Sequence, residues 1–192
     1  MTHRASSWIR ERLAARLLRR AVVSLVLAFA LAASAAPGLT EYQVKAAFLF
    51  NFTRFTEWPA GTFTTTNAPL IIGIVGEDPF DKTLDDLVRG EVAQGHPLVI
   101  QRLRADEDLR HCHVLFISSS EKDRLPTLLA PLAGLPIETV GDVEGFAEKG
   151  GVVNFYLENK AVKMEINKAA ADRAGLKISS KLFSLARGTK SK

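Results

Sequence analysis

Three consecutive residues, His111-Cys112-His113, are the best candidate in the sequence for reactive or metal-binding chemistry. Cysteine catalysis pairs a thiolate with an imidazole, and both groups also bind zinc. In an extended strand, residues 111 and 113 lie on one face and Cys112 on the other, so Cys112 cannot form a dyad with either neighbour. A metal site would need a further ligand, and after the N-terminal region the remaining histidine is His96. We therefore expect Cys112 to be a buried free thiol, and the two histidines to mark the solvent-exposed edge of a strand.

Other active-site motifs are missing or incomplete. Gly73 and Gly76 end an apolar run, but they lack the G-x-G-x-x-G spacing of a dinucleotide site and are typical of a tight turn. The run Ser118-Ser119-Ser120 stands where a receiver domain would need a phosphate-accepting aspartate, and no G-x-S-x-G elbow occurs. No two carboxylates form an evident acid–base couple. We therefore predict that the protein is not an enzyme and uses no cofactor or metal.

These residues lie at the ends of apolar runs that alternate with helical patterns. The runs predict buried strands at 69–76, 97–103, 113–118 and 137–141, followed by a hairpin at 151–167. Helical patterns lie between and around them, at about 41–58, 78–87, 122–132, 168–174 and 179–186. The alternation predicts a three-layer α/β fold: a mostly parallel sheet, flavodoxin-like in outline, with helices on both faces and a C-terminal antiparallel hairpin. Because such folds host many functions, the function must be argued from a site.

The first 35 residues have the three parts of a secretory signal peptide. A basic run is followed by an apolar run from Ala21 to Ala33 and then by small residues. The apolar run is shorter than the ~20 residues that span a bilayer, which favours a cleaved signal over a retained membrane anchor. The triplet Ala33-Ser34-Ala35 fits the A-x-A cleavage rule, so we predict cleavage after Ala35 and export to the periplasm. A single domain at 36–187 and a short tail at 188–192 would then remain.

Removing this segment changes the charge of the chain. Six of the 25 basic and one of the 21 acidic side chains lie in residues 1–35, which leaves 19 basic and 20 acidic groups and a net charge of −1. No basic stripe remains that would favour nucleic-acid binding. With Cys112 as its single cysteine, the chain forms no intramolecular disulfide, so the fold depends on an apolar core.

Five aromatic residues are concentrated in the segment "KAAFLFNFTRFTEWP" at 45–59. Helical spacing puts Val44, Phe48, Phe52 and Phe55 on one side, which we expect to face the core, with Leu49 on the far flank. Phe50 falls outside this stripe. A helix that is apolar on more than one face is either packed on both sides or presents one face to a partner. We therefore predict that Phe50 and the end of the helix at Trp58 contribute to a binding surface.

Five segments of the chain resemble the YfiR-like family of periplasmic regulators: "VKAAFLFNFTRFTEWP", "IIGIVGEDPF", "CHVLFIS", "GGVVNFYLENKAVKMEIN" and "AGLKISSKLFSLA". The resemblance extends from about Tyr42 to Ala186. Its most specific parts are the Phe-rich helix with Trp58-Pro59 and the closing "ISSKLFSLA". None of the segments is an enzymatic motif. The best-known relatives carry paired cysteines, which this chain lacks, so disulfide-dependent behaviour is not expected here.

The resemblance implies a small periplasmic α/β protein that represses an inner-membrane diguanylate cyclase by binding its periplasmic domain. Repression would lower cyclic-di-GMP and biofilm formation. An OmpA-like outer-membrane lipoprotein is the implied second partner, which captures the repressor and releases the cyclase. The resemblance and their apolar character also add Leu182 and Phe183 to the candidate partner surface. Whether the chain forms a homodimer is left open.

A second reading is a periplasmic small-molecule receptor, or an accessory protein of another membrane sensor such as a histidine kinase. Open α/β sheets usually bind ligands in a crevice at the carboxyl ends of their strands. In this sequence the residues expected there are Glu77, Asp78, Ser118–Ser120 and Gly141-Asp142. They could hold a polar ligand, but they show no order of nucleophile and base.

Overall fold

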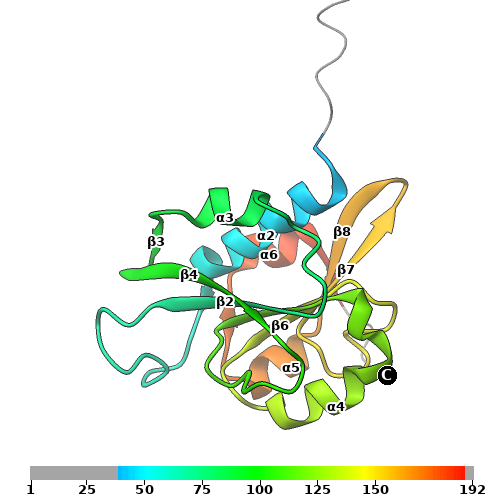
Figure 1. Ribbon diagram of the computed structural model, residues 1–192. Helices are drawn as coiled ribbons and strands as arrows, with labels where there is room; N and C mark the ends of the chain where they lie inside the picture. Colours follow the sequence, from blue (N-terminus) through cyan, green and yellow to red (C-terminus); the bar gives the residue numbers. More distant parts are fainter. Residues whose placement is uncertain (1–38, 189–192) are drawn as a thin grey trace, which may run out of the picture. The chain divides into compact units, whose positions relative to one another are not determined.

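The computed structural model describes residues 39–188, and its central feature is one large mixed sheet (Figure 1). The strand order is β10-β8-β7-β6-β5-β2-β4-β3. Neighbours from β4 through β7 are parallel, β8 is antiparallel to β7, β10 is parallel to β8 and β3 is antiparallel to β4. In chain order these strands are β2 (Leu70–Val75), β3 (Val92–Ala93), β4 (His96–Leu103), β5 (Val114–Ile117), β6 (Glu138–Gly141), β7 (Val153–Glu158), β8 (Ala161–Ile166) and β10 (Ala186–Gly188).

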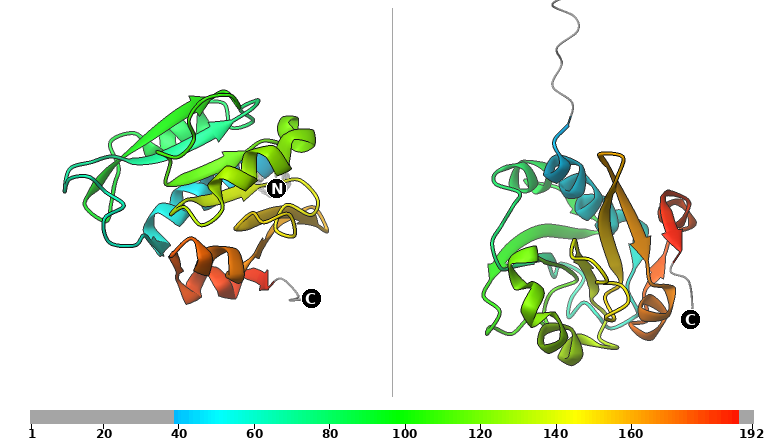
Figure 2. Two further views of the ribbon diagram at one scale, coloured as in Figure 1. Left: turned by 90° about the horizontal axis from the view of Figure 1, so that it is seen from below. Right: turned by 90° about the vertical axis from the view of Figure 1, so that its right-hand side faces the viewer.

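The predicted fold class is confirmed. When the five parallel strands are numbered 1 to 5 along the chain, their spatial order across the sheet is 2-1-3-4-5, as in a flavodoxin-like sheet. Strands β7 and β8 form the expected antiparallel hairpin. Helices lie on both faces of the sheet (Figures 1 and 2). They are α2 (Glu41–Phe55), α3 (Thr83–Val88), α4 (Leu125–Leu129), α5 (Lys168–Arg173) and α6 (Ser180–Leu185), with short 3-10 turns at Ser119–Arg124 and Ala130–Leu132.

The two faces of the sheet carry separate cores because side chains alternate along each strand. On one face Ile72 and Phe116 pack with Leu49 and Phe52 of α2. On the other face Leu115, Ile117 and Val75 pack with the leucines of α4. The uninterrupted apolar runs of the sequence correspond to these doubly covered strands.

Helix α2 begins as expected but ends earlier. Thr40 and Gln43 form a capping box: the Gln43 amide donates to the Thr40 hydroxyl (3.3 Å), and the Thr40 amide donates to the Gln43 side chain (2.8 Å). The helix was predicted to continue to Trp58, but it ends at Phe55. The next residues form β1 (Thr56–Glu57), which pairs with β9 (Lys177–Ile178) in a two-stranded antiparallel ribbon. Pairing with a segment more than a hundred residues away leaves no local signal in the sequence.

The buried face of α2 also differs from the predicted stripe. Lys45, Ala46, Leu49, Phe52 and Thr53 are buried, whereas Val44, Phe48 and Phe55 are only half-buried. Leu49, expected on the far flank, has no exposed surface. The helix is turned in this way because it packs against α3 as well as against the sheet, and because Lys45 is drawn into the interior by an acidic partner.

Candidate functional site

The four residues predicted to form a partner surface contact different elements. Phe50 is half-buried on α2, with the Arg54 guanidinium 4.5 Å above its ring. Trp58 directly follows β1 and is half-buried, and Phe183 is half-buried on α6. Leu182 is only 2% exposed, so it holds α6 on the core and presents almost no surface to a partner. Phe50, Trp58 and Phe183 therefore remain candidates, although each also packs against the same core.

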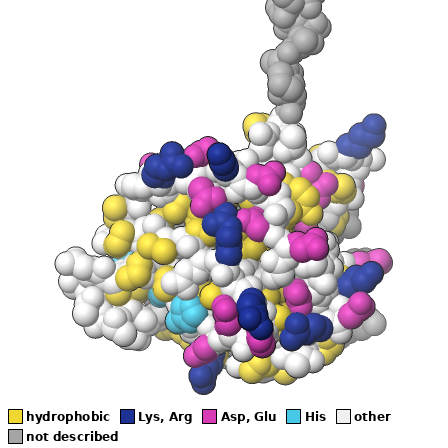
Figure 3. Space-filling model, in the orientation of Figure 1, with side chains coloured by type: hydrophobic (Ala, Val, Ile, Leu, Met, Phe, Trp, Pro, Cys, Tyr) yellow, Lys and Arg dark blue, Asp and Glu magenta, His cyan; other side chains and the backbone are white. Residues whose placement is uncertain are grey.

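An exposed apolar surface that the sequence did not reveal lies on β3 and β4. Arg54 covers the Phe50 ring and forms an ion pair of 2.9 Å with Glu91, the residue before Val92 of β3. Val92 is 55% exposed and Val99 of β4 is 38% exposed. In Figure 3 hydrophobic side chains gather over β3 and β4, whereas acidic and basic side chains are intermixed elsewhere on this face. We call Val92 and Val99 the β3–β4 surface; the strand register places both on the face of the sheet opposite to α2 and Phe50.

The His111-Cys112-His113 segment is split by the structure. Cys112 is 3% exposed, and its burial raises the pKa of its thiol to about 12, so it remains protonated. Its Sγ fills the space above Gly73, so a Cβ atom at residue 73 would lie only 2.6 Å from the Cys112 Sγ. His111 is exposed and hydrogen-bonded to Gln101, as expected for a strand edge. His113, however, is 7% exposed, so the expectation that it lies at the wet edge is wrong.

His113 is buried by a loop that packs under the amino ends of the strands. The Phe63 ring stacks on His113 (4.6 Å between centroids) and on His96 (3.7 Å), and Trp58 meets His113 edge-on at 6.1 Å. The His113 Nδ1 accepts a hydrogen bond from the Ile71 amide (3.1 Å), which places the ring proton on Nε2. Burial lowers the pKa of His113 to about 4, so the imidazole is neutral.

Next to this cluster lies an ionisable side chain with an unusual environment. Glu138 begins β6, has no exposed surface, and neither carboxyl oxygen has a hydrogen-bond partner among the described residues. Burial raises the pKa of Glu138 to about 8. The nearby Thr56 hydroxyl would lower this pKa, but it forms no close hydrogen bond with the carboxyl group. Thr56 and Trp58 lie on the same side of β1, while Glu57 between them is exposed. The β1–β9 ribbon therefore covers a protonated carboxyl group.

We expect this carboxyl group to make the protein less stable as the pH rises. Glu138 keeps its proton in the fold up to about pH 8, but loses it near pH 4.5 when unfolded. Between these values the unfolded chain binds fewer protons, so the free energy of unfolding falls as pH rises. His113 acts oppositely only between about pH 4 and 6.5. Urea titrations from pH 6.5 to 8 should show a falling stability that Glu138→Gln removes and the exposed control Glu148→Gln retains. An unchanged slope in Glu138→Gln would contradict this prediction.

The crevice at the carboxyl ends of the strands is filled by the chain itself. The Ser120 hydroxyl accepts a hydrogen bond from the Glu77 amide (2.9 Å), which closes the gap between β2 and β5. Asp142, directly after β6, is covered by the first turns of α2: Lys45 forms an ion pair with it (2.7 Å) and the Tyr42 hydroxyl donates to it (3.1 Å). Within residues 39–188 these groups are partners of one another, which weakens the case for a ligand at this edge.

Across residues 39–188 no group of three or more His, Cys, Asp or Glu side chains is arranged to hold a metal ion. No helix in the same range is long and apolar enough to cross a membrane. The predicted signal sequence and its cleavage residues, Ala33 and Ala35, lie outside the described residues.

Comparisons with solved structures give two distant likenesses. A conserved domain protein from Vibrio cholerae O1 biovar El Tor str. N16961 is 15% identical, with a TM-score of 0.48 over 62% of this chain and 54% of that chain. The ABC domain from Streptococcus pneumonia, solved in complex with L-Trp, is 11% identical, with a TM-score of 0.46 over 62% of this chain and 56% of that one. The chain thus aligns with about half the length of each. No curated protein matches it significantly.

A family model gives the decisive match. The model described as YfiR/HmsC-like aligns with residues 42–187, which include every described helix and strand except for the first residue of α2 and the last residue of β10. The match contains the aromatic helix α2, the hairpin of β7 and β8, and the closing segment with α6. The chain therefore belongs to the YfiR/HmsC-like family.

Proposed function

We propose that this protein is a periplasmic regulatory binding protein that represses an inner-membrane diguanylate cyclase by contact with the periplasmic domain of the cyclase. The observation that carries the proposal is the family match over residues 42–187. The side chains agree with a binding role: the candidate thiol is buried and protonated, the candidate histidine is buried and neutral, and the strand-end crevice is filled. We further propose that the protein is not an enzyme and that an OmpA-like outer-membrane lipoprotein removes it from the cyclase.

The β3–β4 surface is our choice for the cyclase contact. Its apolar groups are exposed on β3, a two-residue edge strand, and on the adjacent strand β4, and the Arg54–Glu91 ion pair fixes β3 beside α2. Apolar and aromatic groups at the centre of an interface supply most of its binding energy, while flanking charges act as a rim. Phe50 lies on α2 beneath the Arg54 guanidinium, on the other face of the sheet, and would form a separate contact.

Two matched substitutions test the function and the surface together. Val92 and Leu157 are both apolar strand residues, 55% and 52% exposed, but Leu157 lies near the tip of the β7–β8 hairpin. We expect Val92→Ser to weaken binding to the purified periplasmic domain of the cyclase by more than about 1 kcal/mol. Leu157→Ser should bind like the natural chain, and both variants should keep their thermal stability.

In cells, deletion of the gene should raise cyclic-di-GMP. The natural chain and Leu157→Ser should restore the low level, while Val92→Ser should not. Equal repression by both variants would show that the contact lies elsewhere. No change in cyclic-di-GMP on deletion, together with no binding by the natural chain, would overturn the proposed function itself.

A further inference from the structure

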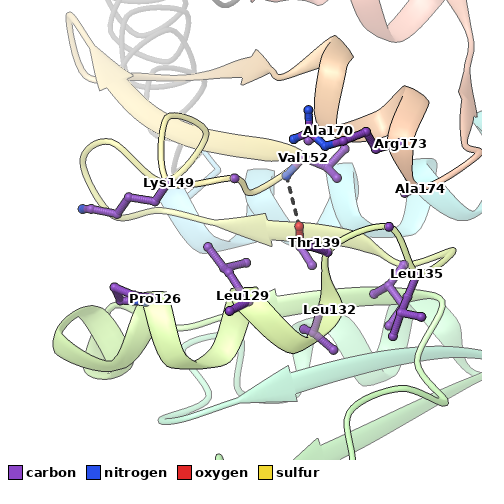
Figure 4. Close-up of a pocket in the computed structure, with 15 residues that line it drawn as sticks. Pro126, Leu129, Leu132, Leu135, Thr139, Lys149, Val152, Ala170, Arg173 and Ala174 are labelled. Atoms are coloured by element: carbon purple, nitrogen blue, oxygen red, sulfur yellow. Dashed lines mark hydrogen bonds between the residues drawn. The ribbon is translucent and has the colours of Figure 1, made fainter.

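A groove lies between α4 and α5 (Figure 4). Its volume is about 220 Å³. One wall is formed by Leu129 and Leu132, and the other by Val152 and Ala170. The Thr139 side chain lies in the floor, where its hydroxyl accepts a hydrogen bond from the Val152 amide (3.0 Å). The groove is separate from the β3–β4 surface and from the crevice at the strand ends.

The lining of this groove restricts the kind of molecule that fits. The apolar lining is entirely aliphatic, with leucine, isoleucine, valine, alanine and proline but no aromatic ring. An aromatic ligand would find no stacking partner there. An apolar cavity of roughly 150 Å³ binds one benzene molecule, which has six carbons, so this volume suits a chain of about eight carbons. A short, flexible hydrocarbon chain fits both conditions.

The charged lining residues are two cations. Lys149 and Arg173 line the groove, and no Asp or Glu does. Arg173 stands out among the arginines whose side chains the structure describes. Six of them, Arg54, Arg89, Arg102, Arg104, Arg110 and Arg124, form ion pairs with carboxylates, and Arg173 does not. Lys149 donates to the Glu144 carbonyl oxygen (3.0 Å) but likewise has no carboxylate partner among the described residues. A negatively charged group on a ligand would be complementary to these two cations.

We propose that the groove binds a free medium-chain aliphatic carboxylate of about eight carbons. The chain lies between Leu129, Leu132 and Val152, and the carboxylate forms charge-assisted hydrogen bonds with the Arg173 guanidinium, whose fork matches both carboxylate oxygens. This site does not depend on the proposed repressor function, because it shares no residue with the β3–β4 surface.

The direct test is a titration of the full mature chain with octanoate, followed by calorimetry and by NMR of its methyl groups. We expect saturable binding, with shifts confined to the methyls of Leu129, Leu132 and Val152. Octylamine, which has the same chain and the opposite charge, should not bind. Arg173→Gln should weaken octanoate binding at least tenfold, since hydrogen bonds to charged groups contribute about 1.5–3 kcal/mol. The matched control Arg124→Gln, an exposed arginine outside the groove, should bind normally.

A second variant tests the apolar part of the site. Ala133 lines the groove and is exposed, so Ala133→Phe should fill the groove without disturbing the core, and should abolish octanoate binding while thermal stability is kept. Three results would overturn the proposal: no methyl shifts at millimolar octanoate, equal affinity of Arg173→Gln and the natural chain, or equal binding of octylamine.

Discussion

Replacing Phe52 with alanine is expected to lower the free energy of unfolding by about 3–5 kcal/mol, the usual cost of removing a buried aromatic ring. Phe52 has no exposed surface. Its ring stacks on Phe155 of β7 (6.0 Å between centroids) and on Phe48 (6.3 Å), so it joins α2 to the β7–β8 hairpin. Urea unfolding followed by circular dichroism measures the loss, which at this size threatens folding at 37 °C.

Phe50→Ala is the matched control, because it removes the same ring two residues away on the same helix. Phe50 is half-buried and one of its contacts is the Arg54 guanidinium, so we expect a stability loss below about 1.5 kcal/mol. We also expect weaker binding to the periplasmic domain of the cyclase. If Phe50→Ala destabilised the protein as much as Phe52→Ala, Phe50 would belong to the core and would not contribute to the partner surface.

Lys45→Met is expected to cost about 3–5 kcal/mol, because it removes one partner of a buried ion pair and leaves the other uncompensated. The Lys45 and Asp142 side chains are 3% and 4% exposed. Burial opposes the charge on Lys45, but its hydrogen bonds to Asp142 and Glu41 outweigh this and raise its pKa. Lys45 is therefore charged at neutral pH, and the stability that its pKa shift supplies is lost only at strongly alkaline pH.

The matched control for this prediction is an exposed lysine–aspartate ion pair with the same nitrogen–oxygen distance. Lys168 and Asp172 are 2.7 Å apart, but their side chains are 69% and 58% exposed. Lys168→Met should therefore change the free energy of unfolding by no more than about 0.5 kcal/mol. The double variant Lys45→Met/Asp142→Leu should recover much of the loss, since it removes both charges. Equal effects of Lys45→Met and Lys168→Met in thermal unfolding would contradict the argument.

The sequence predicts the strands well because burial on both faces leaves apolar runs with clear ends. The strands around Ile72, Phe116 and Val140 were placed to within one or two residues for this reason. The end of α2 and the burial of His113 were not predicted, because they depend on the β9 segment and on the loop with Phe63, which meet them only in the folded chain. Local patterns contain no information about such pairings.

The positions of two charged residues in apolar stretches of the sequence could have predicted that they are buried. Lys45 lies in an otherwise apolar stretch of the aromatic helix, and Glu138 interrupts the apolar run of β6. Charged groups in such positions are buried only when they are paired or neutralised. Lys45 meets the first condition through Asp142, and Glu138 meets the second by keeping its proton. The β3–β4 surface left no such signal, because exposed valines on edge strands resemble buried ones in sequence.

The pairing of β1 with β9 and of β10 with β8 can form only after the last residues of the domain are present. Thr56 pairs with Ile178, and Ala186 pairs with Met164, so early segments need the last residues to complete their hydrogen bonds. A chain that crosses a membrane with its N-terminus first would deliver α2 and its aromatic side chains long before their cover arrives. Folding through such distant contacts is slow and leaves apolar surface open. If the chain is exported as proposed, the aromatic helix would therefore offer a binding segment to a periplasmic chaperone until α6 and β10 emerge.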